Sequence, residues 1–358
     1  MKKNSKLEAS GQLTIGIDVS DRSSCYCYLN QAGEICGEGK LRSTPEAFRQ
    51  HFGGLARAVI ALEAGTHSRW MSALPRECGH EVIVANPGRL RLLTTSNNKN
   101  DPRDARTLAE IAWAKPALLQ PVRHRSAEAQ RDLNLVRARD LLVEARTKLI
   151  NGVRCLVKGF GARVPKCASG QFCQQAHQHL PEEARPATGP LLEVIDELSV
   201  RIGEYDEMLE HVAQTRYPQT TLLKQVSGVG TLSALAFVLT IEDPHRFARS
   251  RDVGSFLGLR PKQQDSGDRS PQLRITKAGD SYLRRMLVSC AHYILGPFGP
   301  DTDLRRWGLK LCERGGKNAK KRAVVAVARK LAVLLHRLWV TGEVYEPLRN
   351  QAEADVAA

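Results

Sequence analysis

Short apolar runs alternate with segments of helical periodicity near the start of the chain. A short apolar run bounded by turn residues predicts a buried strand, whereas apolar residues three or four positions apart predict a helix. Thr44 followed by Pro45 is a typical helix start, and a second helix is expected around Trp70. The strands are expected at 13–19, 24–29, 34–41, 58–63 and 81–85.

The order of these segments predicts how the strands pair. The first three strands are joined only by turns and should form an antiparallel meander. The later strands are separated by helices, so they should pair in parallel. This is the outline of a ribonuclease-H-like sheet, and the first part of the chain is therefore expected to be an α/β domain.

The middle of the chain has the pattern of two long amphipathic helices. Apolar and small residues recur there at alternating spacings of three and four, the heptad pattern of helices that pack side by side. A segment rich in Gly, Pro and Gln, 159–190, separates the two stretches, so we expect an antiparallel hairpin or a dimerising coiled coil. Each stretch alone fits an ordinary amphipathic helix equally well. The positions are Leu135, Ala138, Leu142, Ala145, Leu149, Gly152 and Leu156, then Leu191, Ile195, Leu198, Ile202, Tyr205, Leu209 and Val212.

The last third opens on a glycine-containing turn. Gly228 and Gly230 flank Val229 just before an apolar helix expected at 232–239. This pattern is typical of a helix-hairpin-helix, in which glycines let backbone N–H groups approach a phosphate. An ordinary turn between two helices has the same pattern.

Length and composition limit the class of protein. With 358 residues, the chain is long enough for two or three domains, and 42% hydrophobic residues suffice for buried cores. No apolar run approaches the roughly 20 residues that span a bilayer, and the start lacks the apolar region of a secretory signal. We expect a soluble, cytoplasmic protein with an α/β domain at 1–125, a helical arm at 126–215, a mainly helical domain at 216–345 and a disordered tail at 346–358.

The chain is strongly basic, and the basic residues are concentrated towards its end. It has 53 Lys and Arg residues against 38 Asp and Glu residues, a net charge of +15. The stretch 271–340 holds 15 Lys and Arg residues against 4 acidic ones, which is +11 of that total. Such a surface attracts polyanions, and nucleic-acid backbones are the commonest of these. A solvated surface that only aids solubility is the alternative.

Four acidic residues occupy positions where an α/β fold could bring them together. Asp18 and Glu63 end the first and fourth strands, while Asp101 and Asp104 lie on one side of a first helical turn, with Asp101 as N-cap before Pro102. Four neighbouring carboxylates need a cation to offset their repulsion. Oxygen ligands suit Mg²⁺, with Mn²⁺ as a substitute, and two such ions can promote phosphodiester cleavage. Separate roles in a turn, a surface ion pair and a helix cap are the alternative.

A polar loop supplies a candidate nucleophile, Ser266. A serine before a glycine is often only a turn residue, but cations that could clamp a phosphate follow this one at once. Ser270 is a less favoured second nucleophile. The candidate nucleic-acid ligands are Gly228, Gly230, Lys262, Arg274, Lys277, Arg284 and Arg285.

Taken together, these motifs resemble insertion-sequence family one hundred and ten, the DEDD transposases. The similarity runs from about Leu13 to Leu338 and depends on motif order. The sequence departs from the family pattern after Ser266, where a glycine-rich stretch is usual and this chain has Asp268, Arg269 and Ser270. The motifs are GIDVS, ALEAG, NDPRDA, GVG, LGLRP, the pair Ser266 and Gly267, and RITKAGDSYLRRML.

The resemblance implies a RuvC-like N-terminal domain, a coiled-coil linker and a C-terminal transposase domain. It implies that Asp18, Glu63, Asp101 and Asp104 bind Mg²⁺ and that Ser266 becomes joined to DNA. It also implies donor and target DNA as partners, a structured non-coding guide RNA called a bridge RNA, and dimers that pair into tetramers. The protein would then act in a prokaryotic cytoplasm, at the nucleoid when bound to DNA.

Other functions fit part of these observations. A junction-resolving endonuclease would use the carboxylates with metal-activated water and no serine, and a non-enzymatic protein would only bind nucleic acid. A sugar-kinase-like ATPase shares an early Asp but lacks a second glycine-rich phosphate loop. The nine Cys residues are expected to be reduced packing residues. Cys167, Cys173, His177 and His179 do not have a usual zinc spacing, and their pattern indicates no other role.

Overall fold

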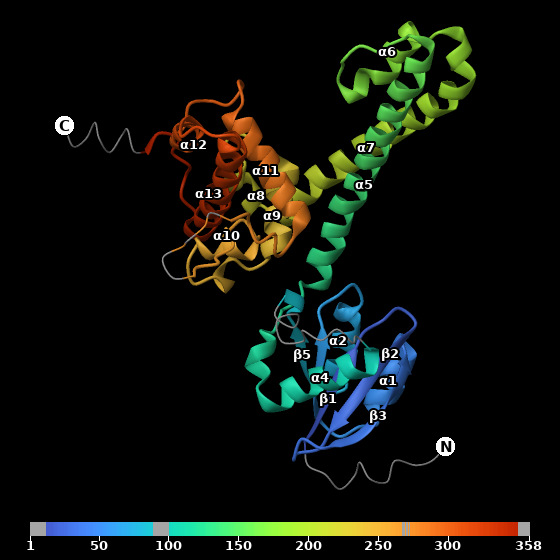
Figure 1. Cartoon of the computed structure of the whole chain (residues 1–358), viewed down its shortest axis with the longest axis vertical. Coiled ribbons are helices and arrows are strands. Elements are labelled where there is room, and N and C mark those ends of the chain that lie inside the picture. The colour runs from blue at the N-terminus through green and yellow to red at the C-terminus, as the bar shows by residue number, and fades with distance from the viewer. Residues whose placement is uncertain (1–11, 89–99, 267–268, 270, 272, 350–358) are drawn as a thin grey trace, which may run out of the picture. The chain divides into compact units, whose positions relative to one another are not determined.

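The computed structural model describes residues 12–88, 100–266, 269, 271 and 273–349 (Figure 1). The chain divides into two compact units, 1–124 and 125–358. The further division of the second unit into an arm and a C-terminal domain stays a prediction. Residues 350–358 of the predicted disordered tail lie outside the part that the structure describes.

Unit 1 contains a mixed sheet with helices on both faces. Thr44 caps the first helix as predicted, since its hydroxyl accepts a hydrogen bond of 3.3 Å from the backbone N–H of Ala47. The elements are β1 (Leu13–Asp18), β2 (Ser23–Leu29), β3 (Ile35–Arg42), α1 (Pro45–Gly53), β4 (Ala58–Glu63), α2 (Ser68–Glu77), β5 (Glu81–Ala85), α4 (Asp101–Ala114) and the 3₁₀ turn η1 (Pro116–Leu119).

The sheet has the strand order β3-β2-β1-β4-β5. β1 with β2 and β2 with β3 pair antiparallel, whereas β1 with β4 and β4 with β5 pair in parallel. The predicted meander followed by parallel strands is confirmed, and the predicted strand limits are correct to within one residue at each end. The α/β expectation for this part of the chain is therefore confirmed.

The two faces of the sheet carry different helices. Alternate strand residues point to opposite faces, so Ile15 and Ile17 of β1 pack on Phe48 of α1 and Met71 of α2. On the other face, α4 crosses β1 at Gly16. A Cβ atom at Gly16 would lie 2.0 Å from the carbonyl oxygen of Ala105, so only glycine allows this approach.

Unit 2 is mainly helical, and its longest non-helical segment lies between α10 and α11. None of the helices in the described ranges is both long and apolar enough to cross a bilayer. The helices are α5 (Ala127–Leu156), α6 (Phe172–His179), α7 (Arg185–Arg216), α8 (Gln219–Leu223), α9 (Thr231–Ile241), α10 (Asp252–Phe256), α11 (Ser281–Leu295), α12 (Asp303–Glu313) and α13 (Ala319–Thr341), with 3₁₀ turns η2 (Val157–Phe160), η3 (Ser169–Gln171), η4 (Glu182–Ala184) and η5 (Pro244–Arg246).

Helices α5 and α7 form an antiparallel pair. Arg139 of α5 donates to Asp206 of α7 at 2.9 Å, and Arg146 donates to Ser199 at 3.1 Å, so the two helices run in opposite directions. The predicted α7 positions are confirmed where that helix is most buried, at Ile195, Ile202, Leu209 and Val212.

The predicted α5 positions are wrong by one residue. The buried side chains of this helix are those of Ala129, Asp132, Leu133, Val136, Ile150 and Val153. Leu156, which the heptad pattern places in the seam, is 49% exposed. In the true seam the polar Arg139 and Arg146 occupy central positions, so a search for apolar residues selects the neighbouring row instead.

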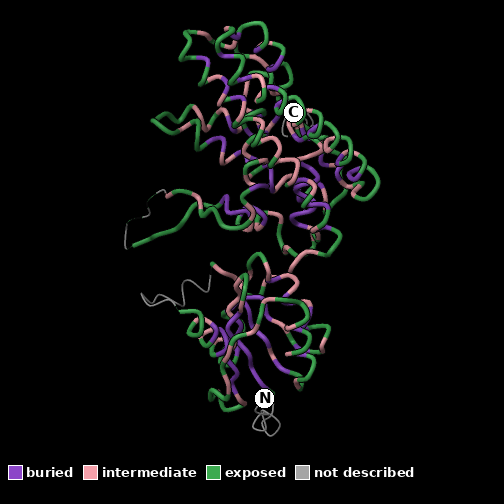
Figure 2. The backbone as a smooth tube through the Cα atoms, turned by 90° about the vertical axis from the view of Figure 1, so that its right-hand side faces the viewer, coloured by how far each residue is buried: buried purple, intermediate pink, exposed green. Residues whose placement is uncertain are grey.

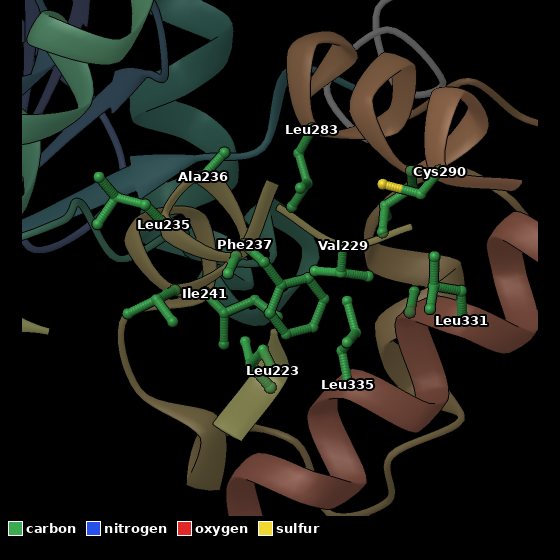
Figure 3. Packing of buried hydrophobic residues seen from close by; sticks show 14 of the residues in the cluster. Leu223, Val229, Leu235, Ala236, Phe237, Ile241, Leu283, Cys290, Leu331 and Leu335 are labelled. Carbon is green, nitrogen blue, oxygen red and sulfur yellow. The ribbon is translucent and has the colours of Figure 1, made fainter. Parts of the chain in front are cut away.

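The root of this pair belongs to the main core of unit 2. Leu133 of α5 and Leu209 of α7 lie in the same hydrophobic cluster as α9 and α13. Helix α9 is almost entirely buried, and Figure 3 shows its Phe237 among side chains that include Leu335 of α13. The apolar helix predicted at 232–239 is thus confirmed, with small extensions at both ends.

Candidate active site and nucleic-acid interface

Asp18 and Glu63 lie side by side at the ends of two parallel strands. The register of β1 and β4 sets these residues at the same level. Gly16 and Ala61, two residues earlier, face α4, so the side chains of Asp18 and Glu63 point to the same face. Both residues are half-buried. The sheet therefore brings these two predicted ligands together.

Asp101 and Asp104 lie in the first turn of α4. The prediction that Asp101 is the N-cap is wrong by one position, because Asn100 has the extended cap conformation and Asp101 is already helical. Proline fits at Pro102 because the N–H groups of the first turn have no intrahelical acceptor. Asp101 is exposed and Asp104 half-buried, and the positive end of the helix dipole favours both carboxylates.

The environment of Cys25 shows that acids from β1 and α4 act on one region. Cys25 is 2% exposed and pairs with Asp18 across β1 and β2. Burial is the main cause that raises the pKa of its thiol; Lys40 opposes this, and the charges of Asp101 and Asp18 raise the pKa further. Charges influence a thiol in this way only from nearby. Cys25 also packs in one cluster with Ala105 of α4, about one turn after Asp101, so the start of α4 lies near the strand pair that includes Asp18.

Lys40 is a candidate that sequence reasoning missed. It pairs with Cys25 across β2 and β3, while Cys25 pairs with Asp18, so the three side chains form one row across the sheet. Lys40 is exposed and has no ion-pair partner within the described ranges. Counting the register of the meander from its turns would have found this cation beside the acids.

The donor set of these four acids fits a hard divalent cation, because carboxylate oxygens are the ligands that Mg²⁺ and Mn²⁺ prefer. In the part of the chain that the structure describes, no three His, Cys, Asp or Glu side chains already form a metal-binding group. The fold thus gathers Asp18, Glu63, Asp101 and Asp104 on one face of unit 1 without bringing them to a common point.

In the segment with Cys167, Cys173, His177 and His179, the two cysteines pack in or against a buried hydrophobic cluster. Cys173 is buried beside Phe172, and its thiol lies 3.5 Å from the carbonyl oxygen of Leu192. Burial, with a smaller contribution from Asp196, raises its pKa to about 12. A metal ligand needs the thiolate, which this environment disfavours. His177 and His179 are exposed.

Ser266 lies near the tip of a two-sided segment, 258–277, which we call the ribbon. Lys262 donates its backbone N–H to the carbonyl of Arg274 at 2.9 Å, and Ser266 and Arg269 exchange two bonds of 3.1 Å. Ser266 is exposed, and the ribbon is drawn mostly in green in Figure 2. Residues 267, 268 and Ser270, the alternative nucleophile, lie outside the described residues.

Three predicted nucleic-acid ligands project from the ribbon into solvent. Lys262, Arg274 and Lys277 are exposed, as is Arg269. Among the residues with described positions, none of the four has a carboxylate within ion-pair distance. The ribbon therefore presents cations that no carboxylate of the described residues pairs with.

Arg284 and Arg285 are engaged with the protein instead. Arg284 donates to the carbonyl oxygens of Leu257 and Ala278. Arg285 forms ion pairs with Asp140 and with Glu144 of α5, the latter at 2.6 Å. Sequence reasoning treated all basic residues after Ser266 alike, and the tertiary contacts separate them.

A second group of unpaired cations surrounds the turn between α12 and α13. Lys310, Arg314, Lys317, Lys320 and Lys321 are exposed and lack ion-pair partners within the described part of the chain. Other cations of the predicted basic stretch are internally paired, as Arg306 is with Asp301 and Arg337 with Glu343. Within the predicted basic stretch, the described cations without an ion-pair partner thus lie mainly around this turn and on the ribbon.

Gly228 and Gly230 lie in the turn between α8 and α9. Gly228 has φ of +88°, and a Cβ there would lie 2.8 Å from Cδ1 of Tyr293. Gly230 has open space and is the N-cap of α9. A surface depression of about 470 Å³ adjoins both glycines and Lys224. Gly228 has a structural reason to be glycine, whereas the space beside Gly230 leaves room for a ligand.

The geometry of unit 1 defines a class of protein. A mixed sheet of this order, with carboxylates ending adjacent parallel strands, is consistent with a ribonuclease-H-like domain of the kind found in DEDD enzymes. Comparison with known proteins then gives the family. Residues 15–161 match a family of DEDD transposases of the IS110 type, and residues 220–302 match the transposase IS116/IS110/IS902 family.

Individual relatives agree with this assignment. The transposase for insertion sequence element IS1111A of Coxiella burnetii is 35% identical over 340 residues, which cover 92% of this chain and 90% of the relative. A probable family 20 transposase of Pseudomonas aeruginosa is 30% identical over 84% of this chain and 89% of its own length. The transposase for element IS1328 of Yersinia enterocolitica is 30% identical over 77% of this chain and 82% of its own length. The chain belongs to the IS110 family of insertion-sequence transposases.

Proposed function

We propose that this transposase cleaves and rejoins DNA through Ser266, with a divalent cation held by Asp18, Glu63, Asp101 and Asp104. The observation that carries the proposal is the arrangement of unit 1. Asp18 and Glu63 stand side by side facing α4, and α4 packs through Ala105 on Cys25, the partner of Asp18 in the strand register. The exposure of Ser266 among unpaired cations supports the second half of the proposal.

Mg²⁺ is the proposed cation, with Mn²⁺ as a substitute. When bound, it neutralises charge and acts as a Lewis acid at phosphate oxygens. The protein's contribution is to hold four carboxylates on three rigid elements: one at the end of β1, one at the end of β4 and two on the first turn of α4. Rigid supports of this kind keep ligands oriented and lower the cost of organising a site.

Ser266 is the proposed nucleophile. Its Oγ attacks phosphorus, and the new Oγ–P bond forms as the bond from phosphorus to the leaving DNA oxygen breaks. The serine proton passes to solvent, and the leaving oxygen takes up a proton. Attack by a DNA hydroxyl on the phosphoserine reverses these steps. One phosphoester replaces another, so rejoining needs no nucleotide cofactor. Lys262 and Arg274 would offset the charge on the phosphate.

The proposed partners are donor and target DNA, a structured non-coding guide RNA and further copies of the chain. Unpaired cations on the ribbon and around the α12–α13 turn are suited to phosphate backbones. The guide RNA and the pairing of dimers into tetramers rest on the family resemblance. Base pairing by a guide would supply sequence specificity that side chains need not carry.

The test is covalent adduct formation on a DNA substrate with Mg²⁺. Ser266→Ala is expected to abolish the adduct and leave DNA binding intact, while Ser270→Ala keeps the adduct. Asp18→Asn should also stop cleavage, because an amide cannot supply the anionic ligand. Asp21→Asn is the matched control, since Asp21 is exposed and pairs with His67 instead. Adducts that persist in Ser266→Ala would remove this serine from the mechanism.

The partners are tested by purification from cells that carry the flanking DNA. One discrete structured transcript in the sequenced RNA is the expected result. Sedimentation of the purified complex measures the number of copies of the chain. Random cellular RNA in place of one transcript would contradict the guide proposal.

Two other functions are distinguished by the same assays. A junction-resolving endonuclease uses the carboxylates without the serine, and a free 5′-phosphate with no attached protein would indicate it. Its support is that Ser266 and the carboxylates belong to different compact units. A protein that only binds nucleic acid would show salt-dependent binding but no metal-dependent cleavage.

A further inference from the structure

Arg284 connects the two sides of the ribbon at its base. Its Nη1 donates at 2.9 Å to the carbonyl oxygen of Leu257 and at 2.8 Å to that of Ala278. Leu257 immediately precedes the ribbon, 258–277, and Ala278 immediately follows it. One guanidinium nitrogen carries two N–H groups, so a single atom serves both carbonyls. Hydrogen bonds from a charged donor are stronger than neutral ones.

The backbone at this base is tightly packed. Gly258 has φ of +68°, and a Cβ there would lie 2.3 Å from the backbone nitrogen of Ala278. Gly279 has φ of +71°, and a Cβ there would lie 2.1 Å from the carbonyl oxygen of Phe256. Both positions therefore require glycine, and the two sides of the base are in direct contact.

Arg284 is itself held on a capped helix. The Asp280 carboxylate accepts a hydrogen bond of 2.9 Å from the backbone N–H of Leu283 and pairs with Arg137 of α5 at 2.7 Å. The Asp280 side chain is only 9% exposed. The base of the ribbon is thus tied through α11 to α5, whose root lies in the main core of unit 2.

The outer part of the ribbon lacks such support. Ser266 and both residues of the Lys262–Arg274 pair are exposed, so little beyond a few backbone hydrogen bonds holds them. A loop of this kind takes its direction from the geometry of its base. The two hydrogen bonds of Arg284 lie at the base of the ribbon, where a small rotation of the backbone would displace the tip most.

We propose that Arg284 is a positioning residue that staples the base of the ribbon and fixes how Ser266 is presented to DNA. The part concerning Ser266 rests on the proposed function, whereas the staple does not. This role replaces the phosphate-ligand role that the sequence suggested for Arg284. Arg284 and the exposed Arg274 lie only ten positions apart but differ in role. Arg284 positions the ribbon, whereas Arg274 contacts phosphate.

The two roles are separated by Arg284→Lys and Arg274→Gln in the full-length protein. Lysine keeps the charge, but its side chain is shorter and lacks the rigid plane of the guanidinium group, so it does not place two N–H groups where Nη1 of Arg284 places them. Hydrogen exchange is followed on peptides covering 258–280, with β1 peptides of unit 1 as the internal reference. Binding to a DNA duplex is measured against salt concentration, and adduct formation is measured at saturating DNA.

For Arg284→Lys we expect ribbon amides such as those of Thr276 and Lys277 to exchange about tenfold faster. The β1 reference, the DNA affinity and its salt dependence should not change, and adducts should form more slowly. For Arg274→Gln we expect unchanged exchange and a salt slope smaller by about one phosphate contact. Wild-type protein gives a test free of folding effects: amides at the base should exchange more slowly than those of Ser266 and Arg269.

Two results would overturn the staple. One is uniform exchange along the wild-type ribbon. The other is an Arg284→Lys variant with normal exchange, which would show that the two bonds do not restrain the base. Faster ribbon exchange in Arg284→Lys would support the staple. If adducts also persisted in Ser266→Ala, the staple would stand but Ser266 would not be the nucleophile. The failure of one proposal is therefore distinguishable from the failure of the other.

Discussion

The acidic residues of unit 1 and Ser266 of unit 2 are supported in different ways. Asp18 and Glu63 end strands whose backbone is fixed by neighbours on both sides, and α4 covers them at the closest distance that glycine allows. Ser266 lies on the exposed outer part of the ribbon, whose base is anchored by Leu259 and Ile275 on the main core and by the two hydrogen bonds of Arg284.

This difference means that the acidic residues lie on rigid elements, whereas Ser266 lies on a less supported segment. A metal site tolerates little displacement of its ligands, so sheet and helix are suited to carry them. A nucleophile that must reach a phosphate benefits from projecting on an exposed segment. We therefore expect substitutions in unit 1 to affect folding of a whole unit, and substitutions near the ribbon to affect local order.

The largest effect is expected from Gly16→Ala. The new Cβ would meet the backbone of α4 at 2.0 Å, so the helix must shift and the packing of unit 1 is lost in part. We expect a loss of about 3 kcal/mol, measured by hydrogen exchange of β1 amides. Gly65→Ala is the control, because open space surrounds that position. Equal effects of the two substitutions would contradict the close packing of α4.

Gly279→Ala should have a smaller and more local effect. It forces a side chain into a left-handed backbone and against the carbonyl oxygen of Phe256. We expect a local cost of about 2 kcal/mol, seen as faster exchange of ribbon amides without a change in α9. Gly152→Ala in α5 has room for its methyl group and serves as the control. Cooperative unfolding of all of unit 2 would show that the ribbon is not a separate local element.

Cation binding should stabilise unit 1 by a moderate amount. At ten times its dissociation constant, Mg²⁺ is expected to add about 1.4 kcal/mol to the free energy of unfolding of this unit. The unfolding transition of unit 1 measures the effect, and unit 2 should be unaffected. The stabilisation should disappear in Asp18→Asn and remain in Asp21→Asn. An equal stabilisation of both units would indicate a general salt effect.

The smallest effect is expected from Lys40→Gln. The exposed Lys40 shares a row with Asp18 and is suited to contact a phosphate near the acids. Loss of one exposed charge contact should lower kcat/KM for cleavage about threefold, with folding unchanged. Lys115→Gln, at the opposite end of α4 from Asp101, is the matched control. If both variants cleave equally well, Lys40 has no part in the site.

Much of unit 1 could be predicted from local sequence. The apolar runs gave all five strands to within one residue, and their order gave the pairing. The placement of Asp18 and Glu63 at adjacent strand ends followed from that topology. The N-cap at Asn100 was missed because proline fits more than one position of a first helical turn.

The contacts of the basic residues could not be predicted in this way. Arg139 and Arg146 occupy the α5–α7 seam because Asp206 and Ser199 face them from α7. Arg284 bonds to two carbonyls because the chain returns to Leu257 and Ala278 beside it. No local pattern distinguishes this arginine from the exposed Arg274.

The sequence by itself determined the five strands of unit 1, their pairing and the concentration of positive charge, because strand and helix formation depend on periodicity over neighbouring residues. The tertiary structure alone decided which cations remain free, which seam α5 uses and how closely α4 approaches Gly16. The physical reason is that ion pairing and close packing depend on partners distant in the chain, and the same side chain has a different role when a carboxylate, a carbonyl or water lies opposite it.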